Sequence, residues 1–220
     1  PGLTRDFTYG TEFQGVTVFD TQGYFVPPSG TTEQRGRGRG VIGSGYVAPS
    51  RVNTIDYITI QSEGNAKDFG DLTVSRSDCG NISSSTRGIF VGGIIGYSNV
   101  IDYVTIATTS NAVDFGDLSA ANQQMAGVSN STRGLIGGGK TAASNPAGIN
   151  TIEYITIASL GDAQNFGDLL AAQAGHFGTG SATRGIFAGG YTPAETNVIQ
   201  YVTIATLGDA LHFGNITHAR

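Results

Sequence analysis

Few side chains in this sequence could act as acids, bases, nucleophiles or metal ligands. The chain has three histidines and one cysteine, Cys79. His176 stands at the same place in its repeat as Cys79 and Met125 do in theirs. A place that accepts histidine, cysteine and methionine is typical of side-chain packing rather than of a metal-ligand set, and the sequence identifies no histidine that would activate Cys79. These residues therefore predict no catalytic site, no metal and no cofactor.

Arginine and acidic residues recur at a regular spacing and could form charge-assisted hydrogen bonds. Arginine opens four similar strings, RGVIGSG, RGIFVGG, RGLIGGG and RGIFAGG, at Arg39, Arg87, Arg133 and Arg184. An acidic or amide residue recurs later in each unit, at Asp71, Asp117, Asp168 and Asn215. We expect each arginine to bind a carboxylate or a strand-end carbonyl and so to join neighbouring units. A ring of binding sites around a central axis is the alternative.

A glycine pair closes three of the four strings. The pairs are Gly92 and Gly93, Gly138 and Gly139, and Gly189 and Gly190. A phosphate-binding loop would need GxGxxG that opens a helix, and the sequence predicts no helix after such a pattern. We therefore expect these glycines to end strands, where they allow a tight turn and a close approach between neighbouring sheets.

The elements that must position these residues repeat with them. Successive strings are 48, 46 and 51 residues apart, a period that is typical of propeller blades, solenoid turns or arrays. Each unit continues with an NxIxY strand, then a strand with Phe-Gly, then a short stretch before the next arginine. The NxIxY strands are expected at Asn53 to Ile60, Asn99 to Ile106, Asn150 to Ile157 and Asn197 to Ile204. Turn residues such as Gly64-Asn65 and Gly161-Asp162 predict two-residue hairpins between the second and third strands.

Apolar side chains alternate so that both faces of the NxIxY strand are apolar. Ile55 and Tyr57 fall on one face, and Ile58 and Ile60 fall on the other. Such strands are expected where sheets stack face to face. Four strands in about 48 residues predict an all-β fold, a β-propeller of about four blades with four antiparallel strands each. A β-helix and a leucine-rich solenoid fit the period and the leucine content less well.

Two regions follow from the repeat. Residues 39–220 are predicted to be one propeller domain, and residues 1–38 an N-terminal attachment or closure segment. We expect Gly23 to Val26 to close the ring by pairing with the sheet that holds the C-terminal strand. Phe13 to Phe19 would add a further strand or a rudimentary fifth blade. A ring shared between chains is the alternative.

Each unit resembles a kelch repeat. Its hallmarks are an apolar strand that ends in Gly-Gly, a later tyrosine, a large aromatic residue, and an arginine shortly before the next apolar strand. The tyrosines here are Tyr57, Tyr103, Tyr154 and Tyr201, and the late arginine is present at Arg76 and Arg220. The kelch tryptophan is missing and phenylalanine stands near its place, while Asn122 and Gln173 replace two of the late arginines. The resemblance implies the propeller fold.

The particular form of the repeat also resembles structural proteins of tailed bacteriophages, particularly marine ones. The segment VPPSGTTEQR, from Val26 to Arg35, is similar to one found in phage tail-fibre and virion proteins. The resemblance implies a protein that is made in the host cytoplasm and carried in the virion. Other virion proteins or a host-surface glycan would then be its partners.

The loops that follow the glycine pairs vary in length and content. They are Tyr46 to Val52, Ile94 to Ser98, Lys140 to Ile149 and Tyr191 to Thr196. All four should emerge on one face of a rigid scaffold, where recognition usually lies. Tyr46, Tyr97, Lys140 and Tyr191 are the candidate binding residues, because a tyrosine ring can stack on a sugar or anchor a protein partner. The alternative is that these are neutral surface loops.

Composition narrows the function further. The net charge is −5 and the basic residues are spread along the chain, which disfavours nucleic-acid binding. No apolar run approaches the ~18–20 residues that would cross a bilayer, so no membrane insertion is expected. We predict a non-enzymatic virion structural or adhesion module that binds a protein or a host surface, with a homo-oligomer left open. A glycan-binding lectin propeller is the first alternative. A copper oxidase of the galactose-oxidase type, which shares kelch blades, is the second, although no two histidines fall in one plausible site.

Overall fold

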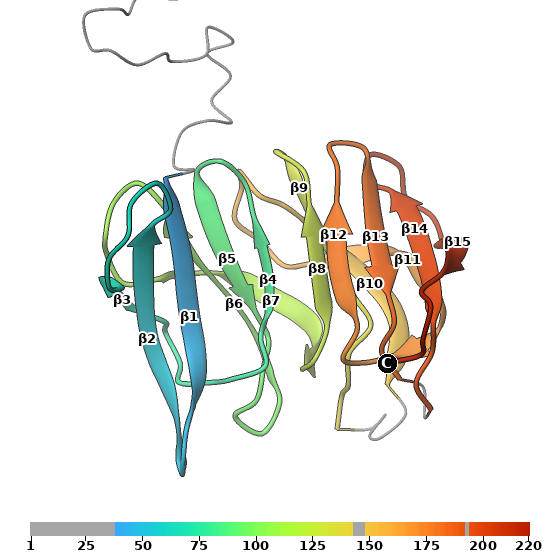
Figure 1. Cartoon of the computed structure of the whole chain (residues 1–220), viewed down its shortest axis with the longest axis horizontal. Coiled ribbons are helices and arrows are strands. Elements are labelled where there is room, and N and C mark those ends of the chain that lie inside the picture. The colour runs from blue at the N-terminus through green and yellow to red at the C-terminus, as the bar shows by residue number, and fades with distance from the viewer. Residues whose placement is uncertain (1–37, 143–147, 192–193) are drawn as a thin grey trace, which may run out of the picture.

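The computed structural model in Figure 1 describes residues 38–142, 148–191 and 194–220. Throughout that part of the chain the regular structure is β, in four antiparallel sheets, and no helix occurs. The predicted all-β class is therefore confirmed. The strands are β1 Arg39–Val47, β2 Ser50–Thr59, β3 Lys67–Asp71, β4 Gly80–Ser83, β5 Arg87–Val91, β6 Ser98–Thr105, β7 Val113–Asn122, β8 Ala126–Ser129, β9 Arg133–Gly137, β10 Ile149–Thr156, β11 Gln164–Gln173, β12 Phe177–Gly180, β13 Arg184–Ala188, β14 Val198–Thr203 and β15 Leu211–Asn215.

The strands of each sheet follow the order of the chain. Sheet 1 is β1-β2-β3, sheet 2 is β4-β5-β6-β7, sheet 3 is β8-β9-β10-β11, and sheet 4 is β12-β13-β14-β15. The four sheets succeed one another across the molecule from sheet 1 at the left to sheet 4 at the right (Figure 1). The short strands before Arg87, Arg133 and Arg184 pair with the strands that these arginines begin, as Gly80–Ser83 pairs with Arg87–Val91. The short strand therefore belongs to the sheet that follows it.

Three apolar clusters fill the spaces between neighbouring sheets. Between sheets 1 and 2, Ile55, Phe69 and Leu72 pack against Phe90 and Val104. Clusters with the corresponding residues lie between sheets 2 and 3 and between sheets 3 and 4. Burying one such side chain contributes about 1.5–3 kcal/mol. The two-sided apolar pattern of the NxIxY strands thus reflects sheets that are covered on both faces.

A bulge recurs where the second and third strands of the repeat pair. The register shifts at Ile55/Asp56, at Ile101/Asp102, at Ile152/Glu153 and at Ile199/Gln200. Opposite the first three bulges stand Gly70, Gly116 and Gly167, with φ angles of +144°, +146° and +154°. A side chain there would also collide with the next sheet, since a Cβ on Gly116 would lie 2.5 Å from the Gly161 carbonyl oxygen. Glycine is required by both the backbone angle and the close approach.

The predicted two-residue hairpins are wrong. Seven residues, such as 60–66, connect the second strand to the third. A turn closes at once after β2, where the amide of Ser62 donates to the carbonyl of Thr59 at 3.1 Å. The Asn or Asp residue instead reaches the preceding sheet, because the side-chain oxygen of Asn111 accepts from the amide of Asp71 at 3.1 Å. The Asn and Asp residues that suggested tight hairpins therefore form contacts between sheets.

The predictions for Gly23 to Val26 and Phe13 to Phe19 lie outside the described residues. Sheet 4 already has four strands, whereas sheet 1 has three. Among the described residues, the strand position that sheets 2 to 4 fill and sheet 1 does not fill lies beside β1. Sheets 1 and 4 each leave one apolar face exposed, as Ile42 and Phe213 show.

Candidate functional site

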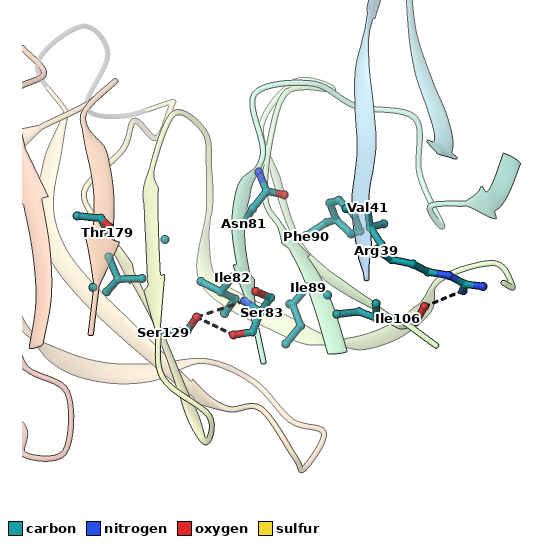
Figure 2. A pocket seen from close by; sticks show the side chains of 15 residues that line it. Arg39, Val41, Asn81, Ile82, Ser83, Ile89, Phe90, Ile106, Ser129 and Thr179 are labelled. Atoms are coloured by element: carbon teal, nitrogen blue, oxygen red, sulfur yellow. Dashed lines mark hydrogen bonds between the residues drawn. The ribbon is translucent and has the colours of Figure 1, made fainter. Parts of the chain in front are cut away.

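A groove of about 440 Å³ runs along the first strands of the sheets, where β1, β4, β8 and β12 border it (Figure 2). Close packing of these strands shapes it. The side chain of Ser129 donates to the carbonyl of Ser83 at 2.7 Å and accepts from the amide of Ser83 at 3.3 Å. Further along, a Cβ on Gly178 would lie 2.5 Å from the carbonyl oxygen of Gly127. Small residues thus let the backbones of neighbouring sheets touch.

The groove has an apolar floor and a polar rim. Its floor includes Ile82, Ile89 and Phe90, and its rim includes Asn81 and Thr179. The single ionisable side chain among its lining residues is Arg39. That guanidinium donates to the carbonyl of Ile106 at 2.9 Å, so its hydrogen-bonding capacity is partly used. The lining can hold a ligand by shape and by backbone groups, but it lacks an acid–base pair.

The edge of β1 gives the groove a further property. In the described part of the chain, β1 pairs with β2 on one side only. An unpaired strand edge presents N–H and C=O groups that can bind an extended segment. Sequence reasoning missed this groove because every residue in it belongs to the repeated scaffold, and among the described residues sheet 1 has one strand fewer than the other sheets.

The repeat arginines join each sheet to the next one. Arg39, Arg87 and Arg133 donate to the carbonyls of Ile106, Ile157 and Ile204 at 2.9, 2.7 and 2.9 Å. Each also lies over the repeat tyrosine of its own sheet, and the guanidinium carbon of Arg87 is 4.3 Å from the centre of the Tyr103 ring. Arg184 lies over Tyr201 in the same way, at 4.4 Å. The contact is to a strand-end carbonyl, and the recurring aspartates contribute their backbone instead.

The glycine pairs end the arginine strands. Gly92 and Gly93 have φ angles of +58° and +114°, and the pairs Gly138-Gly139 and Gly189-Gly190 are similar. The second glycine donates its amide to the last strand of its unit, as Gly93 does to the carbonyl of Asn122 at 2.8 Å. A Cβ on Gly93 would lie 2.6 Å from the carbonyl oxygen of Ser77. These glycines form the turn from which the variable loops leave.

The loops between the arginine strand and the NxIxY strand emerge at one edge of the stack, at the bottom of Figure 1. We call this the loop edge. Tyr46 is exposed there, with the guanidinium carbon of Arg51 5.3 Å from the centre of its ring. Arg51 in turn donates to the hydroxyl of Ser77 at 3.2 Å. The predicted loop from Tyr46 to Val52 is thus mostly strand, and a tyrosine ring and a cation stand together near the turn of the β1–β2 hairpin.

A second cluster on the loop edge joins residues from sheets 3 and 4. The ammonium nitrogen of Lys140 lies 5.0 Å from the centre of the Tyr191 ring. The Tyr191 hydroxyl donates to the side-chain oxygen of Gln124 at 3.2 Å. The structure thus brings together Lys140 and Tyr191 and adds Gln124, which the sequence did not single out. Tyr97 is half-buried in the β5–β6 connection, and no hydrogen bond or ring contact joins it to the other candidates in the described residues.

Cys79 is partly buried and His176 is buried in the packing, whereas His212 and His218 are exposed. Burial raises the pKa of the Cys79 thiol, which disfavours the thiolate. Burial also lowers the pKa of His176 to about 4, and the Gly137 backbone opposes that shift only in part. Neither ring nitrogen of His176 has a partner with hydrogen-bond geometry in the described residues. Nor do three His, Cys, Asp or Glu side chains gather there into a group that could hold a metal ion.

No protein-family model matches this chain, and no curated protein is significantly similar to it. No helix within the described ranges is long and apolar enough to cross a membrane. The function therefore has to be argued from the residues of the loop edge and the sheet stack.

Proposed function

We propose that the chain is a non-enzymatic structural or adhesion module whose stacked sheets hold the loop edge rigid for binding. One observation carries the proposal: at the loop edge, cations lie over tyrosine rings. Lys140 and Tyr191 form one such pair, and Arg51 and Tyr46 form the other. Tyrosine and a neighbouring cation are suited to a protein surface or to a sugar that carries a negative charge.

The finer fold belongs to the same proposal. A kelch-like propeller of about four blades agrees with four consecutive antiparallel sheets, in which the first strands of sheets 2 to 4 lie side by side. Closure by an N-terminal strand agrees with the free edge of β1, since a strand added there would give sheet 1 the four strands of the other sheets. Residues 1–37, which would supply it, lie outside the described residues.

The setting proposed for this module is the virion of a tailed bacteriophage. The support is the resemblance of the repeat and of Val26 to Arg35 to phage structural and tail-fibre proteins. Other virion proteins would hold the module, and the loop edge would face a protein or a glycan of the host surface. The protein would be made in the host cytoplasm and leave with the particle.

A lectin that works apart from any particle is the second candidate. The exposed ring of Tyr46 favours it, because sugars stack on accessible aromatic faces. Both candidates use the same residues and differ in what holds the module.

Two measurements test these proposals. Glycan-array binding is compared for the natural chain, for Tyr46→Ala with Tyr191→Ala, and for Leu160→Ala, an exposed control in the connection at the opposite edge. Mass spectrometry then searches purified virions for the chain. Presence in virions supports the particle role, and a glycan signal that only the tyrosine variant loses supports recognition at the loop edge. Absence from virions together with no tyrosine-dependent binding contradicts both.

A further inference from the structure

The two ends of the sheet stack expose faces that are buried everywhere else in the repeat. We call the outward side of sheet 1, with Ile42, Ile58 and Ile60, the leading face. Ile60 is 60 % exposed, whereas Ile106, Ile157 and Ile204 at the same repeat position are 0–8 % exposed. Exposed clusters of large apolar side chains mark interaction surfaces.

The outward side of sheet 4, with Phe177, Phe213 and Ile216, is the trailing face. Phe213 is 54 % exposed, whereas Phe69, Phe115 and Phe166 at the same position are each 2 % exposed. Those three phenylalanines are buried because the following sheet covers them with residues of the leading-face kind. The trailing face therefore has the shape and chemistry of a surface that accepts a leading face.

Hydrogen-bonding groups are left over at the two ends in matching positions. Each arginine of sheets 1 to 3 donates to an isoleucine carbonyl of the next sheet, but the guanidinium of Arg184 has no acceptor among the described residues. The repeat counterpart of those carbonyls on the leading face is that of Ile60. Likewise, the amide of Asp168 donates to Asp209, and the corresponding groups at the ends are the amide of Asn215 and the side chain of Asn65.

A buried polar pair between sheets adds charge complementarity. Between sheets 1 and 2 the pair is Arg76 and Asp102, joined at 2.7 Å and fully buried. Between sheets 3 and 4, Gln200 donates to Gln173 at the same two positions. The trailing end carries Arg220 in the first of these positions, and the leading end carries Asp56 in the second. Arginine and aspartate again face each other if the two ends meet.

Glycine gives a steric sign of the same contact. A Cβ on Gly70, Gly116 or Gly167 would collide with a carbonyl of the next sheet, those of Ser110, Gly161 and Gly208 respectively. A Cβ on Gly214, the fourth glycine of this series, would meet nothing within 4 Å. Gly214 therefore leaves room for the close approach of another sheet, and no described sheet of this chain occupies that room.

We propose that a second copy of this chain docks head to tail, with the leading face of one copy on the trailing face of the next, in place of a ring that closes within one chain. The three contacts between sheets inside the chain supply the pattern for this fourth one. A head-to-tail contact uses two different surfaces, so it continues from copy to copy until a ring closes or a filament forms. This interface is separate from the loop edge, because Tyr46, Lys140 and Tyr191 take no part in it.

Complementary variants test the head-to-tail contact. Phe213→Asp blocks the trailing face and Ile42→Asp blocks the leading face. Sedimentation velocity should show larger species of the natural chain as its concentration rises, and a monomer for each variant alone. A mixture of the two variants should form a one-to-one heterodimer, since each retains one working face. Val113→Asp, at an exposed site on the outer strand of sheet 2, should assemble like the natural chain.

Gly214→Ala separates assembly from folding. Its added methyl group has room in the isolated chain, so its melting temperature should equal that of the natural chain while its assembly is lost. A natural chain that stays monomeric up to its solubility limit overturns the proposal, and so does assembly that survives Phe213→Asp and Gly214→Ala. The natural chain would stay monomeric if residues 1–37 covered the leading face or if the two ends of one chain packed against each other.

Discussion

His176 is a histidine that the fold keeps neutral. Its ring packs edge-on against Phe187, with 5.8 Å between the ring centres, and its surface is buried. Met125 fills the same repeat position between sheets 2 and 3 and is equally buried. The interpretation of this position as a packing site agrees with that environment.

Stability should fall on mild acidification because of His176. The unfolded chain takes up a proton near the ordinary pKa of 6.5, whereas the folded chain does so near 4. The contribution is therefore complete above pH 6.5 and declines as the pH falls toward 4, by about 3 kcal/mol for this pKa difference. Urea unfolding between pH 7 and pH 4 measures it. His176→Met should flatten this part of the profile, and an equally steep profile in that variant would contradict the assignment.

The buried ion pair of Arg76 and Asp102 can be exchanged for a pair that the repeat itself provides. Asp102 also accepts from the Thr73 hydroxyl at 2.7 Å. Arg76→Gln leaves a buried carboxylate without its cation and should lower the free energy of unfolding by about 3–5 kcal/mol. Adding Asp102→Gln recreates the pair of Gln173 and Gln200 and should restore most of that loss. A double-mutant cycle in urea checks this, and a double variant no more stable than the single one would refute it.

Short strands with glycine are the elements that bring neighbouring sheets together. A Cβ on Gly127 in β8 would collide with the carbonyl of Asn81 in β4. Its φ is outside the left-handed region, so the constraint is one of space alone. These contacts border the groove of Figure 2.

Gly127→Ala should therefore destabilise the fold by forcing sheets 2 and 3 apart. Overpacking of this kind costs about 1–3 kcal/mol, and the carbonyl of Asn81 is backbone that cannot rotate away. Thermal unfolding of a dilute, monomeric sample measures the effect. Gly214→Ala is the matched control, because it places the same methyl group in open space. Equal melting temperatures for the two variants would show that the strands separate freely.

The sequence predicted most strands because each unit repeats them with the same two-sided apolar alternation. The NxIxY prediction from Asn150 to Ile157, for instance, corresponds to β10 at Ile149–Thr156. The prediction of two-residue hairpins was wrong, because Asn65 and its counterparts are of residue types that are common in hairpin turns. In the structure, Asn111 and Asp162 accept hydrogen bonds from the preceding sheet. Lys140 and Tyr191 were singled out separately. Their proximity depends on how sheets 3 and 4 stack, which local sequence does not encode.

On the scale of the whole molecule, the sequence predicted four similar units but not the state of their ends. Units with the same pattern look equally buried in a sequence, so Phe213 could not be distinguished from Phe166 before the sheets were placed. The sequence prediction assigned the closing strand to the sheet of the C-terminal strand, whereas among the described residues it is sheet 1 that has three strands. A repeating sequence does not show at which residue one sheet ends and the next begins. The pairing of β4 with β5 shows that the short strand before Arg87 belongs to the sheet of that arginine.

Removing residues 1–30 tests the proposed N-terminal closure. If that segment supplies a strand beside β1, its loss uncovers the strand edge and the apolar floor near Phe90. A loss of about 2 kcal/mol would lower the thermal midpoint by roughly 4–8 °C in a chain of this size. Differential scanning calorimetry compares the truncated chain with the full chain. An unchanged midpoint would rule out the closure.

The differing polar pairs between sheets also bear on how the chain avoids misfolding. Similar neighbouring units are prone to assemble in the wrong order, because their apolar surfaces are interchangeable. A sheet 1 that packed on sheet 4 would bury the guanidinium of Arg76 against the amide of Gln200 and leave its charge unbalanced. Leaving such a buried charge unpaired is strongly unfavourable. The pairs thus discriminate against wrong neighbours during folding, while the apolar clusters supply attraction that is the same for all of them.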